Sequence, residues 1–144
     1  EIHGSGLQRT IRDLTDELKP HGYTLKQVSD GFIAEHDDGL INIGIWIMPD
    51  NLVDGTIEHW INTLIHPNES NLFNEVKEVV SSLKAKDLQK FKDSRLLKAE
   101  ISTWFAWQKS PGHGLDFFFN EPLIELNHPN YQSFLRWFKS TFNV

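Results

Sequence analysis

One apolar run, residues 41–48, constrains the fold of this chain more than any other feature. It reads INIGIWIM, is rich in β-branched residues, and is stopped by Pro49. A strand that is apolar at nearly every position is typical of one buried on both faces, as in a parallel sheet covered by helices. We therefore expect 41–48 to be a central strand, with Trp46 substantially buried. The fold class is α/β, with a central, mostly parallel sheet flanked by helices.

The rest of the chain divides into two further strands and five helices. The strands are expected near 23–28 and 32–36, and the DDG sequence after the second is a hairpin signal that leads into the apolar run. Helical spacing of apolar residues, bounded by proline, glycine or loop residues, predicts the helices at 7–19, 55–65, 70–86, 96–108 and 131–142. The C-terminal half is thus largely helical. Because a helix precedes the first strand, the order is that of an α/β domain entered after its sheet has begun.

Length and composition exclude several classes of protein. The 144 residues fit one domain, 1–144, and the absence of cysteine removes disulfides, zinc–thiolate sites and thiol nucleophiles. No apolar run approaches the roughly 18 residues that span a bilayer, and residues 1–6 lack a signal-peptide core. We expect a cytoplasmic protein with no membrane partner. The 14 basic and 20 acidic residues give a net charge of -6. This balance argues against a protein whose whole surface binds nucleic acid through phosphate contacts.

Two carboxylates that follow the apolar run are the candidates for a metal site. Asp50 ends the run, and Glu58 falls in the first turn of the next helix. Ligands of α/β proteins lie at the carboxyl ends of strands, and hard oxygen ligands suit Mg²⁺ or Mn²⁺. Each has a structural alternative: Asp50 can form an Asx turn with Asn51, and Glu58 can cap Gly55 from near the third helical position. Asp54 is expected to cap the same helix.

Aromatic side chains crowd the last third of the chain. Their helical spacing, with few basic residues between them, favours core packing over stacking on single-stranded bases. Trp104 and Trp107 are three residues apart and share a helix side, so we expect at least Trp104 to lie in the core. The histidines show no spacing typical of a zinc site.

Three segments together resemble a known family. They are GIWIMPDN at 44–51 with GTIE at 55–58, KAEISTWFAWQ at 98–108 followed by a Pro-Gly pair, and FLRWF at 134–138 with Phe142. The combination resembles the Toprim-like (topoisomerase–primase) domain family of prokaryotes, distantly related to the overcoming-lysogenization-defect (OLD) nucleases. The resemblance runs from about Leu7 to the end of the chain. Its most specific parts are Met-Pro-Asp-Asn with the following Gly-x-x-Glu, and Trp-x-Ala-Trp-Gln.

This resemblance implies a Toprim-like fold and phosphoryl transfer that depends on Mg²⁺ or Mn²⁺. Glu58 matches a position at which OLD-type nucleases hold a further acidic metal ligand, and Asp50 lies in the matching segment. Lys98 falls where those nucleases use a late lysine, which would neutralise charge that develops on a phosphate. Lys92 and Arg95 are close to Lys98 in sequence, and a solvated helix face also explains all three.

Active members of the resembled family carry further acids on two strands, one ending in glutamate and one in Asp-x-Asp. Neither precedes the helix at 7–19 in this chain. We therefore expect this chain to bind Mg²⁺ or Mn²⁺ weakly and not to cleave DNA, unless its parent protein supplies those acids. The alternative is a non-enzymatic scaffold of the same fold that binds nucleic acid or another protein. The sequence leaves the oligomeric state open.

Overall fold

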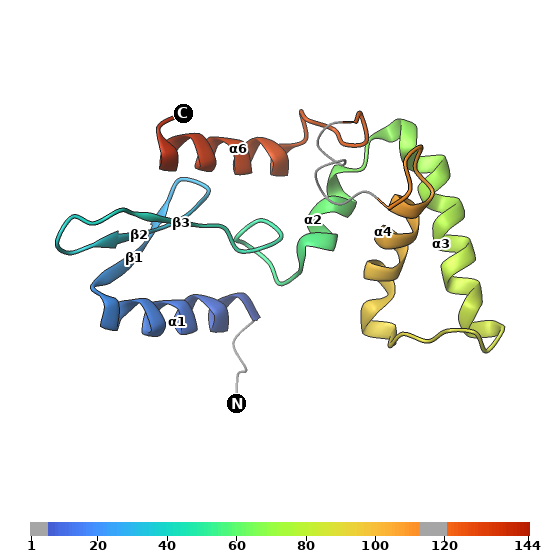
Figure 1. Ribbon diagram of the computed structural model, residues 1–144, viewed down its shortest axis with the longest axis horizontal. Helices are drawn as coiled ribbons and strands as arrows, with labels where there is room; N and C mark the ends of the chain where they lie inside the picture. The colour runs from blue at the N-terminus through green and yellow to red at the C-terminus, as the bar shows by residue number, and fades with distance from the viewer. Residues whose placement is uncertain (1–5, 113–120) are drawn as a thin grey trace. The chain divides into compact units, whose positions relative to one another are not determined.

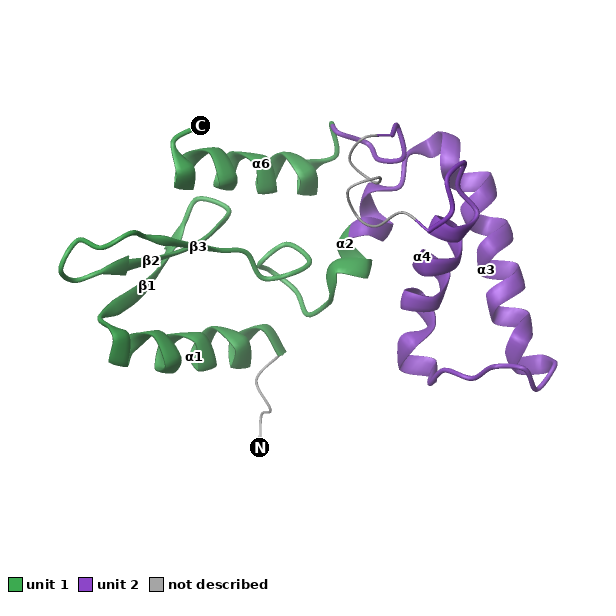
Figure 2. Cartoon of the chain, in the orientation of Figure 1, with its two compact units in different colours: residues 1–60, 127–144 green, residues 61–126 purple. Residues whose placement is uncertain are grey.

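The computed structural model describes residues 6–112 and 121–144. The chain divides into two compact units, residues 1–60 with 127–144, and residues 61–126 (Figure 2). The second unit is thus one segment inserted between two parts of the first. The expectation of a single domain over 1–144 stays a prediction. No described helix is long and apolar enough to cross a membrane.

A three-stranded antiparallel sheet forms the centre of the first unit (Figure 1). Its strands, in spatial order, are β1 (Tyr23–Val28), β2 (Gly31–His36) and β3 (Ile43–Ile45). The central strand β2 is the most buried, from Gly31 to Ala34. Short turns join the three strands, and turns of this length can link only antiparallel neighbours, since a parallel pair needs a long crossover. The α/β class is confirmed, whereas the expected mostly parallel sheet is wrong for the described strands.

The apolar run 41–48 is not a central strand, and this expectation is also wrong. Only Ile43–Ile45 lies in the sheet, at its edge, and Ile41 is 87% exposed. The run leaves the sheet because the Asn51 side-chain oxygen accepts a hydrogen bond from the Ile47 amide at 2.6 Å. That bond occupies the amide that a strand ladder would need.

Two helices lie on either side of the sheet, α1 (Gly6–Leu18) and α6 (Pro129–Phe142), as Figure 1 shows. Trp137 of α6 is buried, and its indole nitrogen donates to the Phe32 carbonyl of β2 at 3.0 Å. Gly31 leaves room for this ring, since a Cβ there would lie 2.4 Å from it. Trp46 is half-buried, and its ring packs at 5.3 Å from that of Trp137. An aromatic cluster therefore joins α6 to the sheet.

The second unit is helical. The helix α2 (Ile57–Leu64) crosses the boundary between the two units, and α3 (Ser70–Ala85) packs against α4 (Leu96–Ala106). Trp104 is fully buried and meets the Phe73 ring edge-on at 5.9 Å, which confirms its predicted place in the core. The predicted helices are confirmed, with ends shifted by a few residues. The buried apolar side chains of α3 and α4 are Phe73, Val76, Val80, Ile101 and Trp104.

Candidate functional site

The loop that follows β3 is held in place by one buried side chain, that of Asn51. Its oxygen accepts from the Ile47 amide, and its nitrogen donates to the Asp30 carbonyl at 2.8 Å. Its own amide donates to the Ile47 carbonyl at 2.9 Å, and its φ is 63°. Asparagine is one of the few non-glycine residues that enter this left-handed region readily. Asn51 therefore ties the loop to the β1–β2 turn, a role that the sequence analysis missed.

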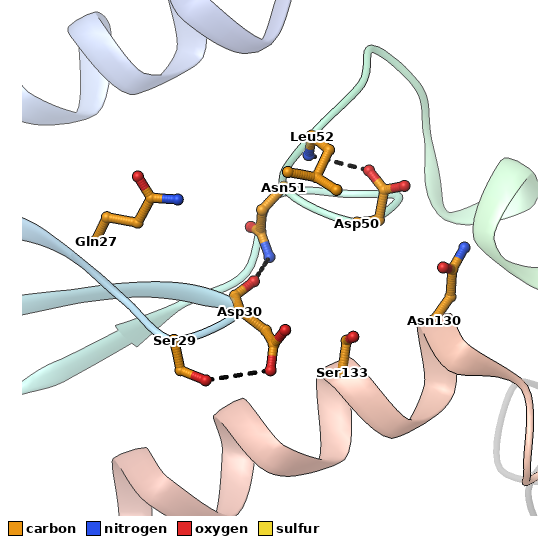
Figure 3. Close-up of a pocket in the computed structure, with 8 residues that line it drawn as sticks. All are labelled: Gln27, Ser29, Asp30, Asp50, Asn51, Leu52, Asn130 and Ser133. Atoms are coloured by element: carbon orange, nitrogen blue, oxygen red, sulfur yellow. Dashed lines mark hydrogen bonds between the residues drawn. The ribbon is translucent and has the colours of Figure 1, made fainter.

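A small polar cavity of about 120 Å³ lies beside this anchor (Figure 3). The carboxylate of Asp30, in the β1–β2 turn, binds Arg136 of α6 through two hydrogen bonds of 3.1 and 3.3 Å. The Arg136 guanidinium holds the pKa of Asp30 below its ordinary value through these bonds, and the Ser29 hydroxyl adds to the effect. Asp30 is therefore an anion at neutral pH. The lining side chains are Gln27, Ser29, Asp30, Asp50, Asn51, Leu52, Asn130 and Ser133.

Asp50 lines the same cavity and closes an Asx turn. One carboxylate oxygen accepts from the Leu52 amide at 3.0 Å and from the Val53 amide at 3.2 Å. The structural alternative proposed for Asp50 is therefore confirmed. The turn uses Oδ1, so a role for Oδ2 towards a ligand is compatible with it. Whether Asp50 binds a metal ion stays a prediction.

Glu58 is the second residue of α2 and is half-buried. The expected helix start at Gly55 is wrong, because α2 begins at Ile57 and Thr56 precedes it. Thr56 and His59 pair across the start of α2, with the Thr56 amide donating to His59 Nδ1 at 3.2 Å. Glu58 therefore does not stand at the third helical position as expected. Its negative charge still lies in the first turn, where the helix dipole favours it.

Asp54 caps a helix, but not the expected one. Its carboxylate accepts from the Leu7 amide at 2.5 Å and from the Gly6 amide at 2.7 Å, at the start of α1. These two bonds, that from Leu7 first, lower the pKa of Asp54. The expectation that Asp54 caps the helix after Gly55 is wrong, because the N-terminus of α1 reaches this loop from 47 residues earlier in the chain.

Lys98 belongs to the second unit. It lies exposed near the start of α4 and borders a cavity with Phe91, Arg95 and Ser102. Asp50 and Glu58 belong to the first unit, on either side of the loop that Asn51 anchors. Among residues 6–112 and 121–144, no three His, Asp or Glu side chains form a group that could hold a metal ion. The predicted ligands in the first unit are thus two carboxylates, Asp50 in the loop after β3 and Glu58 at the start of α2.

The fold and these residues define an α/β protein with an antiparallel sheet and a helical insertion. Residues 4–143 match the model of a family described as protein of unknown function, DUF3226, and the chain belongs to this family. No curated protein and no solved structure matches the sequence.

Proposed function

We propose that this chain is part of a cytoplasmic, Toprim-like protein that performs metal-dependent phosphoryl transfer, with DNA or RNA cleavage as the reaction class. One observation carries the proposal: Asp50 and Glu58 both come after the edge strand β3 in the chain and in the same unit, Asp50 in the loop and Glu58 at the start of α2. Carboxylates at such a place suit Mg²⁺ or Mn²⁺, which prefer hard oxygen ligands.

The open edge of β3 supports the proposal. Among the described strands, β3 pairs only with β2, so its outer edge can accept another strand. A strand added parallel to β3 would end beside the loop that carries Asp50. Acidic residues at the end of that added strand would then lie near Asp50 and supply further oxygen ligands.

Two carboxylates fall short of a two-metal site, which needs several to hold ions about 3.5–4 Å apart. In this proposal another segment or another chain provides the remaining acids. The chain of residues 1–144 by itself then binds Mg²⁺ or Mn²⁺ weakly and leaves DNA intact.

A nuclease assay with Mn²⁺ tests the proposal on this chain and on the longest natural protein that contains it. We expect cleavage only by the longer protein, and we expect Glu58→Gln and Asp50→Asn to abolish it. Asparagine can keep the Asx turn of residue 50 because it retains an acceptor oxygen, so its effect isolates the charge. The matched control is Glu75→Gln, an exposed residue of α3. Full activity in both site variants would contradict the proposal.

A second candidate is a non-enzymatic interaction domain. It is favoured by large apolar side chains exposed in the connection that leads into β3, Leu40 at 59% and Ile41 at 87%. The edge strand β3 itself carries no charged residue, and an edge of this kind is a template for pairing with another strand. The longer protein would then bind a partner and show no metal-dependent cleavage, which the same assay distinguishes.

A further inference from the structure

Basic residues gather in one segment of this acidic chain. Residues 84–98 hold six of the 14 basic residues and only two acidic ones, whereas the whole chain carries a net charge of -6. The segment comprises the end of α3, the connection to α4, the short 3-10 helix Asp93–Arg95 and the first turn of α4. All six cations are exposed: Lys84, Lys86, Lys90, Lys92, Arg95 and Lys98.

One of the two acidic side chains in this segment, Asp93, already forms an ion pair with a lysine. Asp93 binds Lys84 at 2.6 Å and the Gln89 amide at 2.8 Å, and these bonds, that to Lys84 first, lower its pKa. Asp93 thus compensates the charge of Lys84, at the end of α3. Two of the other cations, Arg95 and Lys98, lie at the start of α4.

An open depression of about 450 Å³ lies on the surface of this basic segment, and we call it the α4 pocket. It is lined by Phe91, Arg95, Lys98, Ala99 and Ser102. The last four are spaced i, i+3, i+4 and i+7, so they share one face of the helix that starts at Leu96. The half-buried Phe91 ring gives the pocket an aromatic surface. Its volume falls in the range of pockets that bind small ligands.

We propose that the α4 pocket binds a nucleotide unit of single-stranded nucleic acid. The guanidinium of Arg95 and the ammonium of Lys98 donate to the phosphate, and the Ser102 hydroxyl adds a neutral donor. A base stacks against Phe91, as bases do on aromatic side chains in proteins that bind single strands. The site deepens the proposed function and rests on it for its purpose, which is to hold the substrate strand.

The test is fluorescence anisotropy with a labelled single-stranded oligonucleotide, the whole chain, and EDTA in place of metal ions. We expect binding at low salt that weakens linearly with the logarithm of salt concentration. Arg95→Gln with Lys98→Gln should reduce the slope by about 1.4, because each lost phosphate contact on a single strand contributes about 0.7. The matched control removes two exposed charges from the first unit, Arg12→Gln with Lys19→Gln, and should keep the slope.

A second variant tests the base contact. Phe91→Leu keeps an apolar side chain but removes the ring, and it should weaken binding of the single strand with no change in salt slope. Equal slopes for the two double variants, or undetectable binding of the unmutated chain at low salt, would overturn the proposal. Tighter binding to vesicles of anionic lipid than to the oligonucleotide would assign the basic segment to a membrane surface and also overturn it.

Because EDTA removes the metal ions, this binding assay is independent of cleavage. Binding without cleavage in the longer protein would contradict the proposed function but not the proposal that the α4 pocket binds nucleic acid. Cleavage that is unaffected by Arg95→Gln with Lys98→Gln would support the proposed function and contradict the role of the α4 pocket in holding the substrate strand.

Discussion

Trp104 shows how much a single residue contributes to the second unit. Its side chain is 0% exposed, its ring contacts Phe73 and Phe105, and its indole nitrogen donates to Glu69 at 3.2 Å. The same Glu69 oxygen accepts from Gln108 at 3.0 Å. Trp104 therefore fills the core and also satisfies its polar atom at the start of α3.

Replacing this ring by a methyl group should be costly. Trp104→Ala removes a large buried side chain, so we expect a loss of about 3–5 kcal/mol in the free energy of unfolding. Trp107→Ala is the matched control, because Trp107 is 43% exposed and should lose much less. Chemical denaturation measures both. An unchanged midpoint for Trp104→Ala would contradict its role in the core.

Glu100 is the one acidic side chain buried in α4, at 8% exposure. Burial raises its pKa above the ordinary value of 4.5, and the positive charge of Lys77 opposes the rise. The folded state therefore binds the proton of Glu100 more tightly than the unfolded state does. As the pH rises above 4.5 through the raised pKa of Glu100, the folded state loses stability relative to the unfolded state. At neutral pH the full cost of burying the charged carboxylate is present.

We expect Glu100→Gln to raise the melting temperature at pH 7, because glutamine has a similar shape and carries no charge to bury. The gain should shrink as the pH falls towards 4.5 and below it, where the wild-type carboxyl becomes protonated in the unfolded state as well as in the folded state. Thermal unfolding across a pH series measures this difference. The exposed Glu78→Gln serves as control, and a gain that does not depend on pH would contradict the argument.

At the scale of elements, long-range bonds decide where helices and strands begin and end. The cap of α1 comes from Asp54 in the loop before α2, and the end of β3 depends on Asn51. Both residues belong to the same loop, so this loop fixes α1, the β1–β2 turn and the edge strand together. Its shape therefore matters to the site as much as its carboxylates do.

Asn51→Ala should destabilise the first unit. It leaves the Ile47 amide and the Asp30 carbonyl without their partner, each a cost of about 1–3 kcal/mol when buried. Alanine is also strained at a φ of 63°. Asn51→Asp keeps the acceptor and loses the donor, so it should lie between alanine and wild type in chemical denaturation. Wild-type stability in Asn51→Ala would show that the loop keeps its shape without this anchor.

At the scale of the whole molecule, the two candidate regions belong to different units. Unit one carries Asp50 in the loop after β3 and Glu58 at the start of α2, and unit two carries the basic segment and the α4 pocket. In the proposed function the carboxylates bind metal ions, and in the further inference the basic segment binds the phosphate of the nucleic acid.

Metal binding by the whole chain can be followed through its thermal stability. A ligand raises the melting temperature only when its concentration is well above its dissociation constant. With Asp50 and Glu58 alone, we expect millimolar Mg²⁺ or Mn²⁺ to change the melting temperature no more than sodium chloride of equal ionic strength. A larger rise, lost in Asp50→Asn, would mean that this chain already holds a complete metal site.

The sequence by itself determined the helices α3, α4 and α6, the hairpin region and the burial of Trp104. Helical periodicity and turn residues are local, so the chain encodes them over one or two turns. It also located Asp50 and Glu58 after the apolar run and indicated the Asx turn of Asp50.

Only the tertiary structure decided the edge position of 41–48, the partner of Asp54 and the pairing of Asp30 with Arg136. An apolar run has the same sequence whether strands or helices cover it, and a short polar side chain can cap any helix start that reaches it. The Asp30–Arg136 pair joins residues 106 apart. Such contacts depend on which segments meet when the chain folds, and no local pattern records that.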